Sequence, residues 1–377
     1  MQVLMFVTNS FTSDPRVYNE AESLIRTGHN VTVIAWDRER GNLPRQNWDG
    51  IQVIRLRTRH SLRYGFASWI WNGLNLLSWQ WQAYRQALKL DKESAFNVVH
   101  CHDLDTLAIG VRLKRKLRIP LVYDAHEIFG YMMARRFPVW AANLFLRLEK
   151  HLMKRVDKII NVGESQKRFY ENLTDKPILV VMNCKPLQSL EYQSFGCDRD
   201  FTILYIGSLH EGRAIYMLVH AAKDLPGVRC LIGGIGTPAY IKVLEDECLA
   251  TSNVSFLGRV PFDEVIPVTG KADCVFLMVN PEDFNNRMGL GNKQFEAMVC
   301  GRPIICTKGT YSGDLTEQEE VGLAVEYSEE ALRDAIIELR DNPALRERLG
   351  RNALKAAITK YNWQKQEEEL LALYNSL

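Results

Sequence analysis

The chain has 377 residues, of which 46% are hydrophobic and 24% are charged. This composition is typical of globular proteins and excludes a disordered, collagen-like or coiled-coil chain. The length favours two domains, and the lack of any run of about 20 apolar residues excludes an ordinary transmembrane span. Residues 1–185 carry 28 Lys and Arg against 17 Asp and Glu, whereas the rest carries 19 against 28. The basic half is therefore expected to face a polyanion or an anionic membrane.

The amino-terminal sequence and the cysteines indicate the compartment. An apolar run starts at Val3 without a basic leader, so we expect no signal peptide and a cytoplasmic protein. The eight cysteines form no Cys-x-x-Cys pair and lie mostly in apolar runs. They predict reduced core thiols rather than disulfides or a zinc site.

The first half alternates short apolar runs with helical patterns, as in a sheet of buried parallel strands. The predicted strands are Val3–Val7, Asn30–Ala35, Val53–Leu56, Asn97–His100, Pro120–Tyr123, Lys158–Val162 and Ile178–Met182. A helix over residues 16–27 is expected to end before Gly28, which favours positive φ. Apolar residues spaced three and four apart predict an amphipathic helix over residues 66–89.

A second series of the same kind follows a polar linker at residues 184–200. Its predicted strands are Phe201–Ile206, Arg229–Gly233, Val254–Leu257, Cys274–Met278, Pro303–Cys306 and Gly322–Val325. Its helices are expected to begin near Ala214, Pro238, Phe262, Asn292 and Ser328. Two such series predict two doubly wound α/β domains that face each other across a cleft, with ligands at the carboxyl ends of the strands.

The best functional motif is the glycine-rich start of a helix at residues 289–293. Free amides and the helix dipole attract phosphate there, and Lys293 adds a positive charge. Glu296 follows one turn later, where a carboxylate can accept both hydroxyls of a ribose. The alternative is ordinary capping, with Glu296 as a first-turn acid.

This stretch resembles the carboxyl-terminal signature of glycosyltransferase family four, a group of retaining nucleotide-sugar transferases with the GT-B fold. The family pattern has two glutamates separated by seven residues. Glu296 matches the second, and Met288 stands where the first is expected. A subgroup with an Asn-Lys-x-x-Glu variant matches Asn292, Lys293 and Glu296.

The resemblance implies a domain organisation. Residues 1–185 form an acceptor-side Rossmann-like domain, and residues 186–358 form the nucleotide-sugar-binding Rossmann-like domain. A carboxyl-terminal helix at 359–377 is expected to cross back toward the first domain.

Further donor-binding residues follow from the resemblance. In the family, two basic residues after the first strand of the second domain bind the donor diphosphate; Ser208 replaces the first here, and Arg213 fills the second position. Arg suits phosphate because its planar group makes two parallel contacts, although a solvated charge is the alternative. Arg213 and Lys293 are therefore the predicted catalytic cations. The predicted donor-binding residues are Gly207, Gly234, Arg259, Val260, Gly289, Leu290, Gly291, Asn292 and Glu296.

His126 is the catalytic candidate of the first half, because the family has a His at this place, close to the transferred sugar. A neutral imidazole would bind a sugar hydroxyl or relay the acceptor's proton, with Asp124 or Glu127 fixing its tautomer. The alternative is a structural His at a strand end. His100 and His102 end the preceding strand, but a metal site needs further ligands at defined spacing, and none is expected.

The acceptor side is predicted from two features. Asp14 and Arg16 lie in the loop that, in relatives, is near the diphosphate and the acceptor. Basic and aromatic residues also mix at 55–71, at 131–140, which holds Arg135 and Arg136, and at 150–158, as at a membrane surface. We expect four of the aromatic side chains to be exposed: Trp69, Trp71, Phe137 and Trp140. Core packing is the alternative for Ile70, Leu77 and Trp81.

The resemblance therefore implies a retaining hexosyltransferase that needs no metal or other cofactor. It would move a sugar from a UDP- or GDP-sugar to a glycan or lipid-linked acceptor at the cytoplasmic membrane face. Arg213, Lys293 and the amides of residues 289–292 would stabilise the leaving diphosphate. The alternatives are a GT-B nucleotide-sugar epimerase or phosphorylase, and a non-catalytic nucleotide-sugar binder, suggested by Met288. No nucleic-acid motif is present, so no nucleic-acid partner is expected.

Overall fold

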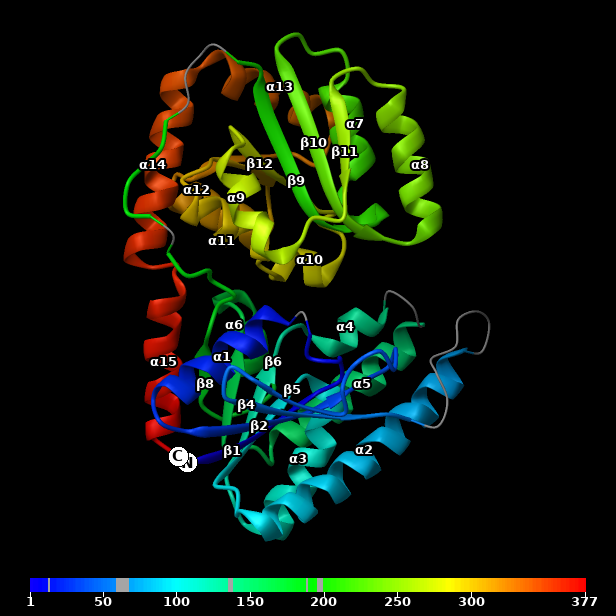
Figure 1. Ribbon diagram of the computed structural model, residues 1–377. Coiled ribbons are helices and arrows are strands. Elements are labelled where there is room, and N and C mark those ends of the chain that lie inside the picture. Colours follow the sequence, from blue (N-terminus) through cyan, green and yellow to red (C-terminus); the bar gives the residue numbers. More distant parts are fainter. Residues whose placement is uncertain (13, 59–67, 135–137, 188, 195–198) are drawn as a thin grey trace. The chain divides into compact units, whose positions relative to one another are not determined.

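The computed structural model describes residues 1–12, 14–58, 68–134, 138–187, 189–194 and 199–377 (Figure 1). The chain forms two compact units. Unit 1 comprises Met1–Val181 together with Glu367–Leu377, and unit 2 comprises Met182–Gln366. Each unit is a sheet of mostly parallel strands with helices between them.

The sheet of unit 1 has eight strands in the order β3-β4-β2-β1-β5-β6-β7-β8, parallel except for β3. The strands are β1 (Gln2–Val7), β2 (Asn30–Trp36), β3 (Arg45–Trp48), β4 (Ile51–Leu56), β5 (Val98–His102), β6 (Leu121–Ala125), β7 (Lys158–Asn161) and β8 (Ile178–Val180). The seven predicted apolar runs are confirmed as strands. Strand β3 was not predicted, because it is a polar, mostly exposed edge strand without an apolar run.

The helices of unit 1 connect these strands. They are α1 (Pro15–Arg26), α2 (Ser68–Glu93), α3 (Leu104–Leu117), α4 (Phe129–Ala134), α5 (Val139–Met153) and α6 (Glu164–Glu171). Asp14 caps α1, since its carboxylate accepts a hydrogen bond from the amide of Val17. Gly28 follows the end of α1 with φ of +85°, which confirms the predicted helix stop.

Helix α2 packs on the sheet through a narrower face than its large apolar side chains suggest. Trp79, Ala83 and Ala87 recur every four residues and are fully buried, and Trp79 stacks on Trp36 of β2. Leu77 and Trp81 are 61% and 55% exposed, so the core-packing alternative is wrong for both. The predicted exposure is confirmed for Trp71 and Trp140. Phe137 and the side chains of Trp69 and Ile70 lie outside the described residues.

The sheet of unit 2 has six parallel strands in the order β11-β10-β9-β12-β13-β14. The strands are β9 (Phe201–Leu209), β10 (Val228–Gly236), β11 (Val254–Gly258), β12 (Cys274–Leu277), β13 (Ile304–Thr307) and β14 (Gly322–Val325), so all six predicted strands are confirmed. The α-helices are α7 (Ile215–Ala222), α8 (Pro238–Leu249), α9 (Val265–Gly270), α10 (Phe284–Met288), α11 (Asn292–Val299), α12 (Tyr311–Gln318), α13 (Glu329–Asp341) and α14 (Pro343–Thr359). Two short 3-10 helices, η1 (Glu211–Arg213) and η2 (Phe262–Glu264), lie in loops.

The segments by which the chain enters and leaves unit 2 lie side by side. Lys185 and Asn362 form a parallel bridge, and the amide of Trp363 donates to the carbonyl oxygen of Lys185 at 3.0 Å. The last helix, α15 (Trp363–Asn375), begins here, and its residues from Glu367 onward belong to unit 1. Within unit 1, the hydroxyl of Tyr374 lies 2.7 Å from Nδ1 of His100. No helix in the described part of the chain is long and apolar enough to span a membrane.

Candidate active site

Two glycines bring strands β9 and β10 of unit 2 together at their carboxyl ends. Gly207 pairs with Gly234, and a Cβ atom on Gly234 would lie 1.7 Å from the carbonyl oxygen of Gly207. A Cβ atom on Gly207 would lie 2.4 Å from Nζ of Lys293. Both positions therefore require glycine, and Gly207 leaves the space that the ammonium group of Lys293 occupies.

Lys293 and Arg213 are two cations of this region whose charges act on each other. Nζ of Lys293 lies 4.8 Å from the ring centroid of Tyr205, and burial together with the charge of Arg213 lowers the pKa of Lys293 to about 8. The Nε atom of Arg213 is buried and makes no hydrogen bond within the described residues. Neither cation forms an ion pair with any described residue. The predicted pair Arg213 and Lys293 is thus a local excess of positive charge that an anion would stabilise.

Helix α11 opens beside these cations. Gly291 is its N-cap residue and offers no side chain to the first amides, so ordinary side-chain capping is absent here among the described residues. Gly289 lies in the turn after α10, where a Cβ atom would be 2.8 Å from the carbonyl oxygen of Asn285. Leu290 packs into the core and holds the turn in place, and Asn292 is exposed. The amide of Gly289 donates to the carbonyl oxygen of Asn285 at 2.8 Å, so it is not one of the free amides predicted for the diphosphate. The first amides of α11 lie next to Lys293 and have no side-chain cap.

Glu296 lies further along α11 in an ion pair that the sequence did not predict. Its Oε1 atom is 3.3 Å from Nζ of Lys185, and both side chains are almost completely buried. The ammonium group of Lys185 also lies 5.1 Å from the ring centroid of Phe262. Lys185 belongs to no motif and is 111 positions from Glu296 in sequence, so no sequence signal pointed to it.

The surroundings of the other residues predicted on the donor side do not indicate a ligand. Val260 packs on β10, since a Cβ atom on Gly233 would be 2.8 Å from its Cγ2 atom, and Arg259 is exposed. Their donor contacts stay predictions. Met288 ends α10, and the nearby carboxylate of Asp283 caps that helix by accepting from the amide of Asn286 at 2.9 Å.

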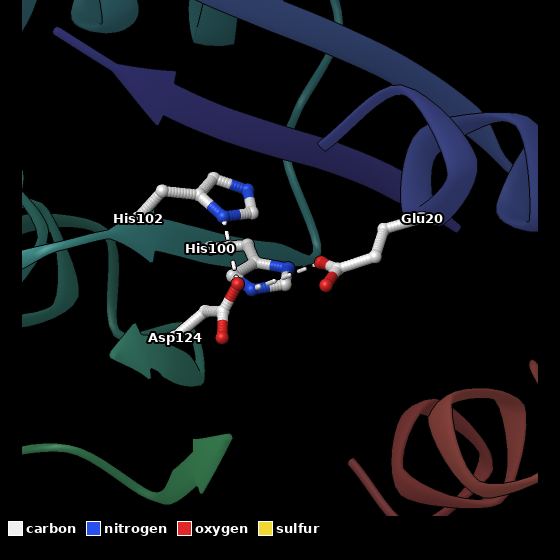
Figure 2. Close-up of side chains that lie close together, drawn as sticks. All are labelled: Glu20, His100, His102 and Asp124. Carbon is white, nitrogen blue, oxygen red and sulfur yellow. Dashed lines mark hydrogen bonds and ion pairs between the residues drawn. The ribbon is translucent and has the colours of Figure 1, made fainter. Parts of the chain in front are cut away.

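Unit 1 contains a buried cluster of charged and aromatic side chains at the ends of β5 and β6. Arg16 donates to both carboxylate oxygens of Asp124, at 2.8 and 2.6 Å, and its Nη2 atom is 3.3 Å from Glu20. Figure 2 shows Asp124 and Glu20 directed toward the two histidines of β5. Nδ1 of His102 lies 3.0 Å from Asp124, and Nε2 of His100 lies 3.8 Å from Glu20. Arg16 and Asp124 are thus internal ion-pair partners.

His126 lies at the partly exposed edge of this cluster. Its Nε2 atom is 2.8 Å from Asp124, and its Nδ1 atom is 3.3 Å from Asp103, which sequence reasoning missed. Burial lowers the pKa of His126, but Asp103 and Asp124 outweigh burial and raise it to about 10. This raised pKa favours the imidazolium at neutral pH over the predicted neutral imidazole. Asp124 does orient the ring as predicted.

The other titratable groups of the cluster also have shifted pKa values. Burial raises the pKa of Asp124, but Arg16 and His126 hold it well below its usual range. Burial and the charge of Asp124 raise the pKa of Glu20 to about 8, so Glu20 is mostly protonated at neutral pH. Burial also lowers the pKa of both His100 and His102, which are neutral.

Glu20, His100, His102 and Asp124 are residue types that bind metals, and their ligand atoms lie within 4.8 Å of one another. A dication at this place would face the fixed guanidinium of Arg16, which already touches both carboxylates, and the nearby imidazolium of His126. The arrangement favours an internal ion-pair network over a metal centre.

Several residues predicted on the acceptor side have other contacts in the structure or lie outside the described residues. Asp14 serves as the cap of α1, and the backbone oxygen of Glu127 accepts from Tyr170. Arg135 and Arg136 lie outside the described residues. Arg55 is buried and donates to backbone oxygens of Ser10 and Phe11. It is therefore not part of a membrane-facing surface.

Comparisons with known proteins agree with this architecture. Residues 13–183 match the model of the glycosyl transferase 4-like domain, and residues 200–342 match that of glycosyl transferases group 1. An uncharacterised glycosyltransferase of Methanocaldococcus jannaschii is 27% identical over 296 residues, which is 77% of this chain and 78% of that protein.

Solved structures share the fold at low identity. Sucrose-phosphate synthase from Thermosynechococcus elongatus superposes with a TM-score of 0.83 at 17% identity, over 100% of this chain and 98% of that one. Anabaena HepE in complex with UDP-glucose gives 0.76 at 16% identity over the whole of both chains. These likenesses show the GT-B fold, and the two family models, which together cover most of the chain, show that it belongs to the family-four-like glycosyltransferases.

Proposed function

We propose that the protein is a retaining, metal-independent hexosyltransferase. It uses a UDP- or GDP-sugar as donor and a glycan or lipid-linked molecule as acceptor, and it works at the cytoplasmic face of a membrane. The observation that carries the proposal is the pair Arg213 and Lys293, whose charges act on each other and which form no ion pair among the described residues. A diphosphate carries the negative charge that would stabilise both cations. Anabaena HepE, which shares the fold, has been solved with UDP-glucose.

In this proposal, unit 2 binds the donor. The amides at the start of α11 and the two cations hold the diphosphate, and Glu296 accepts hydrogen bonds from the ribose hydroxyls. As the bond from sugar to phosphate breaks, negative charge grows on the diphosphate. Fixed positive groups stabilise that charge most in the transition state, so they increase turnover as well as binding.

In the same proposal, the acceptor hydroxyl attacks from the face that the diphosphate leaves, and a diphosphate oxygen takes its proton. The configuration of the sugar is then retained. His126, whose two ring nitrogens lie against the carboxylates of Asp103 and Asp124, supplies a fixed positive charge near the transferred sugar and does not act as a base.

The test is incubation with UDP- and GDP-hexoses, with and without glycan and polyprenyl-phosphate-linked acceptors, followed by mass spectrometry. Transfer that needs the acceptor supports the proposal. Isomerised free donor would identify an epimerase, and donor binding without turnover would identify a binding protein. Arg213→Met and Lys293→Met should each lower turnover at least tenfold, whereas Lys308→Met, which removes an exposed cation of unit 2, should not.

A further inference from the structure

Two helices of unit 1 expose rows of large apolar side chains. On α2 the row consists of Trp71, Leu74, Leu77 and Trp81, which are 43–61% exposed. On α5 it consists of Trp140, Leu144 and Leu148, which are 46–72% exposed. Within each helix the spacing of three or four residues places the row on one side. These two rows supply seven of the large apolar side chains that the described part of the protein leaves in water.

Both rows belong to the same layer of helices. Helix α2 lies between β4 and β5, α3 between β5 and β6, and α5 between β6 and β7 (Figure 1). In the strand order of the sheet, all three connections run in the same direction, from β4 toward β8. Right-handed crossovers therefore place all three on one face of the sheet, and α3 packs against both α2 and α5. The exposed rows thus flank α3 in a single layer, which we call the α2–α5 layer.

Basic side chains surround the apolar rows. Helices α2, α3 and α5 together contain nine Lys and Arg against four Asp and Glu. On α2, Arg85 and Lys89 are exposed just beyond the apolar row, and the guanidinium of Arg85 lies 4.6 Å from the ring centroid of Trp81. Among the four acids, Glu149 is completely buried. The layer therefore offers apolar rings and positive charge to its surroundings, with little negative charge.

We propose that the α2–α5 layer is the surface by which the protein lies on an anionic lipid bilayer. Indole rings and leucines would enter the boundary between headgroups and acyl chains, while the lysines and arginines meet lipid phosphates. This inference deepens the proposed function by naming the membrane-contacting surface. That surface is formed by α2 and α5, not by Arg55, which is buried.

A second copy of the chain is the competing occupant. Two such layers brought face to face would oppose their excess positive charges, which disfavours a symmetric dimer. An anionic bilayer, by contrast, complements both the apolar rows and the charge. The bilayer is therefore the occupant that the observations favour.

The test is flotation of the purified protein with vesicles of equimolar phosphatidylglycerol and phosphatidylcholine, compared with phosphatidylcholine alone. Wild type should float with the anionic vesicles, and less so at high salt. Leu74→Ser/Leu77→Ser should lower the vesicle affinity at least tenfold. Both side chains are more than half exposed, so this variant should fold normally. The matched control is Val243→Ser/Leu249→Ser, which removes two exposed apolar side chains from α8 of unit 2 and should bind like wild type.

Three outcomes would overturn the inference. If the wild-type protein does not float with anionic vesicles at low salt, the α2–α5 layer is not a membrane-binding surface. Equal loss of binding in the α8 control would mean that the effect is not specific to α2. A dimer in solution that the α2 variant dissociates would identify the layer as a subunit interface. None of these results depends on the donor, so calorimetric binding of UDP, measured separately, tests the proposed donor site by itself.

Discussion

Lys185 and Glu296 are oppositely charged side chains that unit 2 holds almost entirely out of water. Removing one partner of a buried ion pair leaves the other charge uncompensated and lowers the stability of the folded protein. Glu296 also acts electrostatically on Lys293, whose pKa it raises against the larger lowering effects of burial and Arg213. Without Lys185, the carboxylate of Glu296 would therefore be drawn toward the cation assigned to the diphosphate.

Lys185→Met should lower the affinity for UDP or GDP roughly tenfold, because hydrogen bonds to charged groups contribute about 1.5–3 kcal/mol. Lys185→Arg should keep most of the affinity, since it keeps the charge. Glu296→Gln should cause a similar loss, and the double variant should lose less than the sum of the two single variants, as expected for residues in contact. Isothermal titration calorimetry measures all four, with Lys308→Met as control. Additive losses would mean that the two side chains act independently.

The buried cluster of unit 1 makes its stability depend on pH. The pKa of Glu20 rises from 4.5 to about 8 on folding, through burial and Asp124, and that of His126 rises from 6.5 to about 10, through Asp103 and Asp124 against burial. A raised pKa adds stability below the unfolded value, and that stability is lost as pH rises through the folded value. Below pH 6.5 the lowered pKa values of His100 and His102 act in the opposite direction, because burial disfavours their protonated forms. Above pH 6.5 the windows of Glu20 and His126 overlap, so unit 1 should become less stable from about pH 6.5 to pH 10.

Glu20→Gln should reduce the loss of stability between about pH 6.5 and pH 8, and His126→Gln should reduce it between about pH 6.5 and pH 10. Thermal unfolding followed by tryptophan fluorescence reports on unit 1, because seven of the eight tryptophans lie in residues 1–181. His220→Gln, which changes an exposed histidine of unit 2, is the control. A melting temperature of wild type that rises over this range would contradict the assignment.

At the scale of elements, helix α2 shows that an apolar pattern does not fix which side of a helix is buried. The stripe that packs on the sheet is Trp79, Ala83 and Ala87, in which small residues let the helix approach closely. The larger leucines face water. Hydrophobic periodicity detects that a helix is amphipathic, and it predicted the length and position of α2 well. It assigned the wrong face to the core, because the largest apolar side chains were taken to be the buried ones.

Leu77→Gln should therefore change the free energy of unfolding by less than about 0.5 kcal/mol, as is usual for surface substitutions. Ala83→Gln should destabilise unit 1 by about 1–3 kcal/mol, because a larger polar side chain must enter a filled core. Urea denaturation followed by tryptophan fluorescence compares the two. A larger effect of Leu77→Gln would restore the core-packing alternative.

The strands were predictable because each of the thirteen is a continuous apolar run, and central strands such as β5 and β6 are completely buried, whereas β3 carries only Arg, Gln, Asn and Trp at an edge. In the candidate site, Arg213, Lys293 and Glu296 followed from a motif. Lys185, Asp103 and Tyr374 did not, because their partners are distant in sequence and only folding brings them together: Lys185 meets Glu296, and Tyr374 meets His100. Local patterns carry no information on such pairs.

At the scale of the molecule, unit 1 is completed by the end of the chain. Residues 367–377 supply Tyr374, which is buried against His100, and Glu367, which pairs with Arg26.

Deleting residues 367–377 should lower the melting temperature of unit 1 strongly, because it leaves an apolar gap and removes the hydrogen bond to His100. Nucleotide binding by unit 2 should persist. Fluorescence and calorimetry measure the two effects, and Tyr374→Phe, which removes only the hydroxyl, should cost about 0.5–1.5 kcal/mol. A truncated chain that melts like wild type would contradict this.

The neighbouring entry and exit segments of unit 2, joined at Lys185 and Asn362, have a consequence for biosynthesis. A ribosome makes every residue of unit 2 before it makes residues 367–377 of unit 1. Unit 1, although translated first, therefore cannot be completed until unit 2 has been synthesised. Throughout that synthesis, the unfinished unit 1 is exposed to chaperones and proteases.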